Sequence, residues 1–144
     1  MIVADILSQK GQEVYCVDCD TKIPEAAGFM ASQHIGAVLV VDDNGLQGII
    51  SERDLAYGIK TIGAGIFDMT VNDLMSKAVI TCAAETTIAE AVEIMAEHEI
   101  RHLPVINDGK VVGLIGMRDV MNERVTELQF ENEALRDQLS SVAA

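Results

Sequence analysis

The chain has 144 residues, of which 49% are hydrophobic and 23% are charged, and these values are typical of a globular protein rather than a disordered one. The length allows one compact domain or two small halves that share a core. The formal net charge of −13 repels nucleic acid and anionic lipid over most of the surface, so a polyanionic ligand would need a local basic pocket.

The sequence predicts neither export nor a membrane span. No apolar run approaches the ~20 residues that cross a bilayer. The N-terminus, "MIVADILSQKG", lacks the basic start, the long apolar stretch and the cleavage site of a signal peptide, so we expect a cytoplasmic protein. The cysteines, Cys16, Cys19 and Cys82, are odd in number, which favours reduced thiols over a disulfide framework.

An internal repeat organises the chain. Residues 23–55 align with residues 88–120 without a gap, and twelve of the aligned positions are identical. The segments "VADIL" (3–7) and "VNDLM" (71–75), which precede the two copies, are also similar, with three extra residues in the first copy before its next strand. This self-similarity indicates two copies of one structural unit.

Each copy predicts the same elements in the same order. A helix with apolar residues at helical spacing is followed by a short buried strand, a hairpin turn, a second strand and a second helix. The predicted elements are the helices 23–35 and 88–100, the strands 37–41 and 103–106, the turns 42–45 and 107–110, and the second strands 46–50 and 111–115. Thr87 and Glu90 form a capping-box pattern, whereas the first copy has Lys22 there and relies on Pro24 just inside the helix.

The predicted fold class is α+β, with two β-α-β-β-α repeats and a long C-terminal helix. One unit of about 60 residues has a thin core, so we expect the two repeats to pack as an intramolecular pair with pseudo-two-fold symmetry. The expected organisation is repeat 1 over residues 1–63, a connector over 64–70, repeat 2 over 71–124 and a coiled-coil-like helix over 125–144.

Apolar residues in the C-terminal segment recur at alternating spacings of four and three, which is the pattern of a short heptad seam. The seam consists of Met121, Val125, Leu128, Leu135, Leu139 and Val142, with Asn132 at one a position. A lone buried Asn at an a position favours a two-stranded parallel register, and Glu131 at g with Arg136 at the next e can pair across a parallel dimer. We therefore expect a homodimer. The alternative is a last helix that folds back on its own module or frays, because three heptads are marginal alone.

The segments "GIISERDL" (48–55), "IRHLPV" (100–105) and "GLIGMRDV" (113–120), at this spacing, resemble the two halves of a tandem cystathionine-β-synthase (CBS) domain pair, also called a Bateman module. The resemblance covers roughly residues 1–124 and is to the small stand-alone type with a C-terminal helix. It implies a sensor that binds AMP, ADP, ATP, NAD or S-adenosylmethionine in clefts between the paired sheets. It does not imply catalysis or a catalytic cofactor.

The resemblance implies that ribose is held by the last residue of the motif Gly-h-h-(Ser/Thr)-x-x-Asp, which is Asp54 in the first copy and Asp119 in the second. A carboxylate offers two acceptor oxygens and can hold the two ribose hydroxyls bidentately. Ser51 can donate to ribose or phosphate, Arg53 and Arg118 supply the charge and fork geometry that phosphate favours, and each following helix points free amides at an anion.

Further nucleotide-binding residues follow from the same resemblance. The strand after the first helix lines the adenine pocket partly through its backbone, and a second segment flanks the base. The corresponding residues are Gly36, Ala37, Arg101, His102 and Leu103 for the strand, and Cys16, Val17, Thr81 and Cys82 for the flanking segment.

Simpler interpretations remain open for several of these residues. Ser51 and Asp54 are close to a capping box and could merely start a helix. Arg53 and Arg118 could be solvated helix residues. The "CVDC" segment at 16–19 resembles half of a zinc knuckle, but a zinc site needs four ligands and the sequence has no second pair. No nucleophile triad, phosphate-binding loop of the GxxxxGK type or acid-base pair of carboxylates is recognisable, so we expect no enzyme activity.

The two copies differ at positions that we expect to lie near the ligand. Copy one has Ser51 and Glu52 where copy two has glycine and methionine, and copy two has Arg101 and His102 where copy one has glycine and alanine. We therefore expect the Asp119 copy to hold the more phosphorylated or more tightly bound ligand, because cationic donors gain most against phosphate.

The sequence thus predicts a regulatory module, a homodimer of CBS pairs, that binds AMP, ADP, ATP or NAD and signals its occupancy to an unidentified partner protein. Nucleic acid and membrane are not expected partners, and no metal is expected. One alternative is an interaction or dimerisation scaffold without a ligand. The other is a redox-responsive protein that uses Cys16 and Cys19.

Overall fold

The computed structural model describes residues 1–11 and 13–143, and these form two compact units. The continuous unit is Glu13–Ile80. The split unit combines the N-terminal segment with the chain from Thr81 onward. Each unit contains one three-stranded sheet. The predicted α+β class with two repeats and a long C-terminal helix is confirmed.

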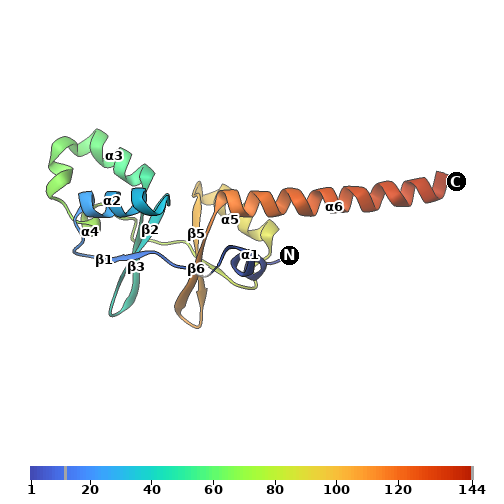
Figure 1. The fold of residues 1–144 in the computed structure, drawn as a ribbon, viewed down its shortest axis with the longest axis horizontal. Coiled ribbons are helices and arrows are strands. Elements are labelled where there is room, and N and C mark those ends of the chain that lie inside the picture. Colours follow the sequence, from blue (N-terminus) through green and yellow to red (C-terminus); the bar gives the residue numbers. More distant parts are fainter. Residues whose placement is uncertain (12, 144) are drawn as a thin grey trace. The chain divides into compact units, whose positions relative to one another are not determined.

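The continuous unit follows the predicted strand-helix-strand-strand-helix order and adds two short helices (Figure 1). Its first strand runs parallel to its second, which is antiparallel to its third. The elements are β1 (Cys16–Asp18), α2 (Ile23–Gln33), β2 (Ala37–Asp42), β3 (Gly45–Ser51), α3 (Glu52–Ile62), the 3₁₀ helix η1 (Gly63–Asp68) and α4 (Val71–Leu74).

The split unit has the same topology, with its short helix supplied by the start of the chain. Its elements are α1 (Val3–Lys10), β4 (Cys82–Ala83), α5 (Ile88–His98), β5 (His102–Asn107), β6 (Lys110–Gly116) and α6 (Met117–Ala143). The hairpin register shifts between Val40 and Val41 in one unit and between Val105 and Ile106, the aligned positions, in the other. A shared irregularity of this kind is an inherited feature of the repeat.

The first helix of each copy ends two residues earlier than the apolar pattern predicts. His34 and Glu99 adopt left-handed backbone conformations, with φ of 55° and 54°, and cap α2 and α5. The following isoleucine amides, of Ile35 and Ile100, then bond to carbonyls inside the helix at 3.0 Å. The isoleucines thus cover the helix end without being part of the helix, which is the geometry of a Schellman-type cap.

Each unit has its own apolar core between helix and sheet. In the continuous unit the buried cluster is Ile23, Ala26, Met30, Val38, Val40, Ile50, Ile66, Val71 and Met75. In the split unit the buried residues include Val3, Ile6, Leu7, Ile88, Ala91, Met95, Leu103, Val105, Ile115 and Val120. Ile66 belongs to the expected connector over 64–70, so this segment contributes to the core rather than merely linking the repeats.

The compact units do not coincide with the repeats drawn from the sequence, because each short helix packs against the sheet of the other copy. Val3 and Ala4 at the start of α1 donate backbone hydrogen bonds to Thr86 and Ala84, at 2.8 and 2.9 Å. Val71 at the start of α4 donates to Thr21 in the same way, at 2.8 Å. Residues 1–11 of the expected repeat 1 thus belong to the unit that contains the sheet of repeat 2, and residues 71–80 of the expected repeat 2 belong to the unit that contains the sheet of repeat 1.

The helix α6 is one continuous helix that includes both the end of repeat 2 and the expected coiled-coil segment (Figure 1). Its first turns pack within the split unit, where Val120 is fully buried and Glu127 lies 3.8 Å from the N-terminal amine of Met1. Towards its end the seam residues are exposed, with Leu135 at 59% and Leu139 at 69%. No helix among the described residues is long and apolar enough to cross a membrane.

Neighbouring atoms approach both motif glycines so closely that an added methyl group would clash with them. A Cβ on Gly48 would lie 2.8 Å from the backbone oxygen of Ser76, whereas a Cβ on Gly113 would meet only the flexible side chain of Leu7. We expect Gly48→Ala to destabilise the fold by about 1–3 kcal/mol and Gly113→Ala by less, because backbone yields less readily than a leucine end. Gly28→Ala in α2 is the control. Its new Cβ would meet nothing within 4 Å, so it should stabilise by roughly 0.5–1 kcal/mol.

Chemical denaturation of the three variants measures this order. Equal losses for Gly48→Ala and Gly28→Ala would show that the close approach of Ser76 to the sheet is not a constraint.

Candidate functional site

The motif aspartate of the continuous unit is held at the start of α3. Ser51 is the N-cap, and Asp54 Oδ2 accepts hydrogen bonds from the Ser51 amide at 2.8 Å and from its hydroxyl at 3.0 Å. The Asp54 amide donates back to the Ser51 hydroxyl at 3.4 Å. The capping box is therefore formed, as the simpler interpretation predicted. Because these bonds use Oδ2, they do not require Oδ1.

The motif aspartate of the split unit has a different set of partners. Asp119 Oδ2 accepts from the Gly116 amide at 3.0 Å, and the glycine provides no hydroxyl. The same oxygen lies 2.9 Å from the ammonium of Lys10, which comes from the end of α1 and also donates to the Leu114 carbonyl at 3.1 Å. The pair is half-exposed, so water still reaches it.

The predicted strand residues lie beside the two aspartates. The Gly36 carbonyl accepts a hydrogen bond from the first amide of α3 at 3.0 Å, and the Arg101 carbonyl accepts one from the first amide of α6 at 2.8 Å. Ala37 pairs with Ser51 across the sheet, and His102 pairs with Gly116. In both units, therefore, the start of this strand lies next to the start of the motif helix in space.

The side chains of these strand residues do not all face solvent. Ala37 and Leu103 are buried in the core, so a ligand could use only their backbone groups or their packing. Arg101, Arg53 and Arg118 are exposed, and each arginine of the motif stands one residue before its aspartate.

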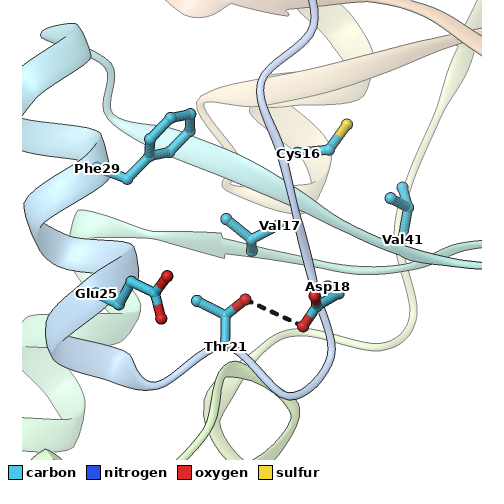
Figure 2. A pocket seen from close by; sticks show the side chains of 7 residues that line it. All are labelled: Cys16, Val17, Asp18, Thr21, Glu25, Phe29 and Val41. Carbon is cyan, nitrogen blue, oxygen red and sulfur yellow. Dashed lines mark hydrogen bonds between the residues drawn. The ribbon is translucent and has the colours of Figure 1, made fainter.

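The remaining predicted residues of the continuous unit lie at a shallow hollow of about 400 Å³ between β1 and α2. Cys16 and Val17 line it, and sequence reasoning missed the other lining residues, which are Asp18, Thr21, Glu25, Phe29 and Val41 (Figure 2). The Thr21 hydroxyl donates to Asp18 Oδ1 at 3.2 Å. Two carboxylates make the hollow unfavourable for phosphate.

The aligned residues of the split unit offer less to a ligand. Thr81 is exposed just before β4, but Cys82 pairs with Val105 inside the sheet and is only 8% exposed. Burial raises the pKa of Cys82 to about 11. This thiol is therefore a core residue that stays protonated at neutral pH.

The two cysteines of the "CVDC" segment are also shifted away from the reactive thiolate. Partial burial of the thiol desolvates it and so raises the pKa of Cys16, although the residue as a whole is exposed. For Cys19, desolvation and then the charges of Asp42, Asp20 and Asp18 raise the pKa, while Lys77 opposes them. Neither thiol has the electropositive surroundings that activate redox-sensing cysteines. Among the described residues, no group of His, Cys, Asp and Glu is placed to hold a metal ion.

Lys10 is the residue at the motif that the sequence analysis did not predict. The signal that could have found it is the basic end of "VADILSQK", which has no counterpart at the aligned place in "VNDLMSKA". The alignment of short segments could not say which sheet the helix joins, and so which aspartate its lysine would meet.

Comparisons with known proteins agree on one family. A sequence model of that family, described as CBS domain, matches residues 3–60 and 71–126. The chain is 31% identical to the CBS domain-containing protein CBSX3, mitochondrial, of Arabidopsis thaliana, over 92% of this chain and 69% of that protein.

Solved structures give the same result. The CBS-domain containing protein ATU1752 from Agrobacterium tumefaciens is 38% identical, with a TM-score of 0.84, over 86% of this chain and 99% of that chain. The CBS domain pair of protein MJ0100, solved in complex with methylthioadenosine and S-adenosyl-L-methionine, is 25% identical, with a TM-score of 0.74, over 85% of this chain and 98% of that chain. The family match ends at residue 126, so most of the exposed seam of α6 lies outside it.

The different thiol environments predict an order of alkylation. At pH 7.5, iodoacetamide should modify exposed Cys16 faster than buried Cys82, because burial raises the pKa of Cys82 to about 11, which lowers its thiolate fraction further, and also shields its sulfur from the reagent. Peptide mass mapping over time measures the rates. In denaturant the rates should converge, and equal rates in the native protein would contradict the burial of Cys82.

Proposed function

Because the chain belongs to the CBS domain family and carries two such domains in tandem, we propose that it is a regulatory module that binds an adenosine-containing ligand and signals its occupancy to a partner protein. Tandem CBS pairs are regulatory ligand-binding modules. The observation that carries the proposal is the same in both units. The motif aspartate lies at the start of a helix, and the first amide of that helix bonds to the backbone just before a neighbouring strand.

The motif aspartate is the proposed ribose ligand. In the continuous unit, Asp54 can cap α3 through Oδ2 and offer Oδ1, so the capping role and the binding role do not exclude each other. In this proposal the exposed arginine before each aspartate, Arg53 or Arg118, would bind phosphate. The backbone of Gly36 and of Arg101, which bonds to the first amide of each motif helix, would contact the adenine edge.

The ligand class rests on the adenosine moiety. The related MJ0100 pair was crystallised with two adenosine-containing molecules, methylthioadenosine and S-adenosyl-L-methionine. Within this class we favour AMP, ADP, ATP or NAD, because the arginines beside both aspartates supply cations that suit phosphate. The module would sense the ligand rather than transform it, and it would act without a catalytic cofactor.

A nucleotide-release experiment tests the class of ligand. Protein purified without added nucleotide and then denatured should release an adenosine-containing molecule that mass spectrometry identifies. Titration with AMP, ADP, ATP, NAD or S-adenosylmethionine should raise the melting temperature with at least one of them. If no adenosine compound is released and none stabilises the protein, the chain is better described as a scaffold without a ligand.

Asp54→Asn and Asp119→Asn test the ribose assignment. Each should weaken binding at its own site by about 10-fold to 100-fold, which corresponds to the ~1.5–3 kcal/mol of a hydrogen bond to a charged group, as measured by calorimetry. The matched control is Asp73→Asn, because Asp73 accepts the Thr70 amide at 3.0 Å at the start of α4 in the same capping role. All three substitutions should cost some helix stability. If Asp73→Asn impairs binding as much as the motif variants do, the aspartates act only as caps.

The exposed seam of α6 supports a second part of the proposal, a homodimer through a parallel coiled coil. The seam residues Leu128, Leu135 and Leu139 are 46–69% exposed, and the seam continues beyond the part of the chain that the family match covers. A second copy in parallel register would cover them, pair the Asn132 side chains and place Glu131 opposite Arg136.

Leu135→Ala tests the dimer. It should shift sedimentation towards monomer, because it truncates a d position at the centre of the seam. Phe130→Ala is the control, since Phe130 lies at f, is 75% exposed and stands outside the seam. Asn132→Leu should strengthen helix association but make the protein less selective for a two-stranded coiled coil, so that higher oligomers form. An unchanged mass for Leu135→Ala would mean that α6 does not mediate self-association.

The redox alternative receives less support from the thiols. The raised pKa values of Cys16 and Cys19 reduce the thiolate that an oxidant would attack. A Cys16→Ser and Cys19→Ser variant with unaltered ligand binding and oxidant response would set this alternative aside.

A further inference from the structure

The short helices α1 and α4 begin alike. Val3 and Val71 are both fully buried at the first helical position. Asp5 and Asp73, two residues later, both accept the amide at the helix start, at 2.9 and 3.0 Å. The next turn carries Leu7 and Met75, which lie over the motif glycines of their units.

The two helices then diverge. The helix α4 ends at Leu74, and the chain continues into a bridge in which Ser76 and Ile49 exchange backbone hydrogen bonds of 3.1 and 2.9 Å. The helix α1 instead continues for another turn to Lys10. The position aligned with Lys10, 68 residues later, is Ala78, which has no charge.

The extra turn delivers an ammonium to one motif aspartate. Lys10 Nζ lies 2.9 Å from Asp119 Oδ2, and the ammonium also donates a hydrogen bond to the Leu114 carbonyl at 3.1 Å. The same Oδ2 also accepts the Gly116 amide at 3.0 Å. Asp119 Oδ2 and Asp54 Oδ2 thus each accept two hydrogen bonds among the described residues, but one donor to Asp119 is an ammonium, whereas the donors to Asp54 are the amide and the hydroxyl of Ser51.

We propose that Lys10 is a specificity-determining residue of the Asp119 site, which it makes selective for phosphate-bearing adenosine ligands over the neutral nucleoside. The inference rests on the proposed function, because it concerns the same ribose-binding aspartate. A ribose diol that engages both oxygens of Asp119 must compete with Lys10 for Oδ2.

The outcome of this competition depends on the charge of the ligand. When a neutral nucleoside displaces Lys10, the ammonium loses its carboxylate partner and gains only water. When the ligand carries a phosphate on the same ribose, the displaced ammonium can pair with that phosphate, because it is attached to the sugar that displaced the ammonium. The exchange is accessible because Lys10 has a flexible stem, its side chain is 44% exposed, and surface ion pairs of this kind are weak.

Lys10→Met tests the inference, because methionine keeps the length of the stem and removes the ammonium. The Asp54→Asn background silences the other site. Calorimetry should then show adenosine binding several-fold more tightly and ADP about 10-fold more weakly, the size of one lost charge-assisted hydrogen bond. The preference for ADP over adenosine should fall accordingly, and its dependence on salt should weaken.

Two control variants separate charge selection from local structure. Lys10→Arg keeps a cation and should retain the preference for ADP. Lys77→Met makes the same change of charge at the corresponding segment of the continuous unit and should leave the preference unaltered. Melting temperatures establish that the variants fold.

The outcomes distinguish this inference from the proposed function. If the unsubstituted protein binds none of AMP, ADP, ATP, NAD and S-adenosylmethionine, the proposed function fails. If it binds one of them and Lys10→Met weakens ADP and adenosine equally, or changes neither, the function stands and the selective role of Lys10 is overturned.

Discussion

The close contact between a short helix and a motif glycine sets the position of nearly everything else in each unit. Met75 and the Ser76 carbonyl lie where a Cβ of Gly48 would be, and Leu7 lies where a Cβ of Gly113 would be. Only a residue without a side chain lets the helix come this close to the strand. The same strand then runs directly into the motif helix, so the contact that holds the strand also fixes where the aspartate stands.

The aspartates show how a structural role and a binding role can share one residue. Asp5, Asp54, Asp73 and Asp119 all accept the amide three residues earlier at a helix start. This local bond needs one carboxylate oxygen, so it orients the side chain and leaves the other oxygen for further use. The local geometry alone cannot separate a cap from a ligand-binding group. The two units differ at the capping oxygen itself, because Asp119 Oδ2 also accepts the ammonium of Lys10, whereas Asp54 Oδ2 accepts the hydroxyl of Ser51.

Charge is distributed against the general trend of the chain. The protein carries a formal net charge of −13, and the hollow beside β1 adds Asp18 and Glu25 to the acidic surface. Each motif aspartate nevertheless has a cationic residue close by, Arg53 next to Asp54 in the sequence and Arg118 and Lys10 at Asp119. Local attraction of a phosphate against a repulsive background favours a small ligand that enters a site over an extended polyanion.

The sequence by itself determined the repeat, the α+β class, the order of the main elements and the positions of both motif aspartates, because these depend on local periodicity, turn chemistry and capping. The hairpins and the capping box at Ser51 follow from neighbours a few residues apart. Only the tertiary structure decided which sheet each short helix joins. "VADIL" and "VNDLM" are too alike for local patterns to assign them, whereas the packing of Leu7 on Gly113 and of Met75 on Gly48 does. The pairing of Lys10 with Asp119, 109 residues away, follows from that exchange, because a long-range ion pair has no local signature in the chain.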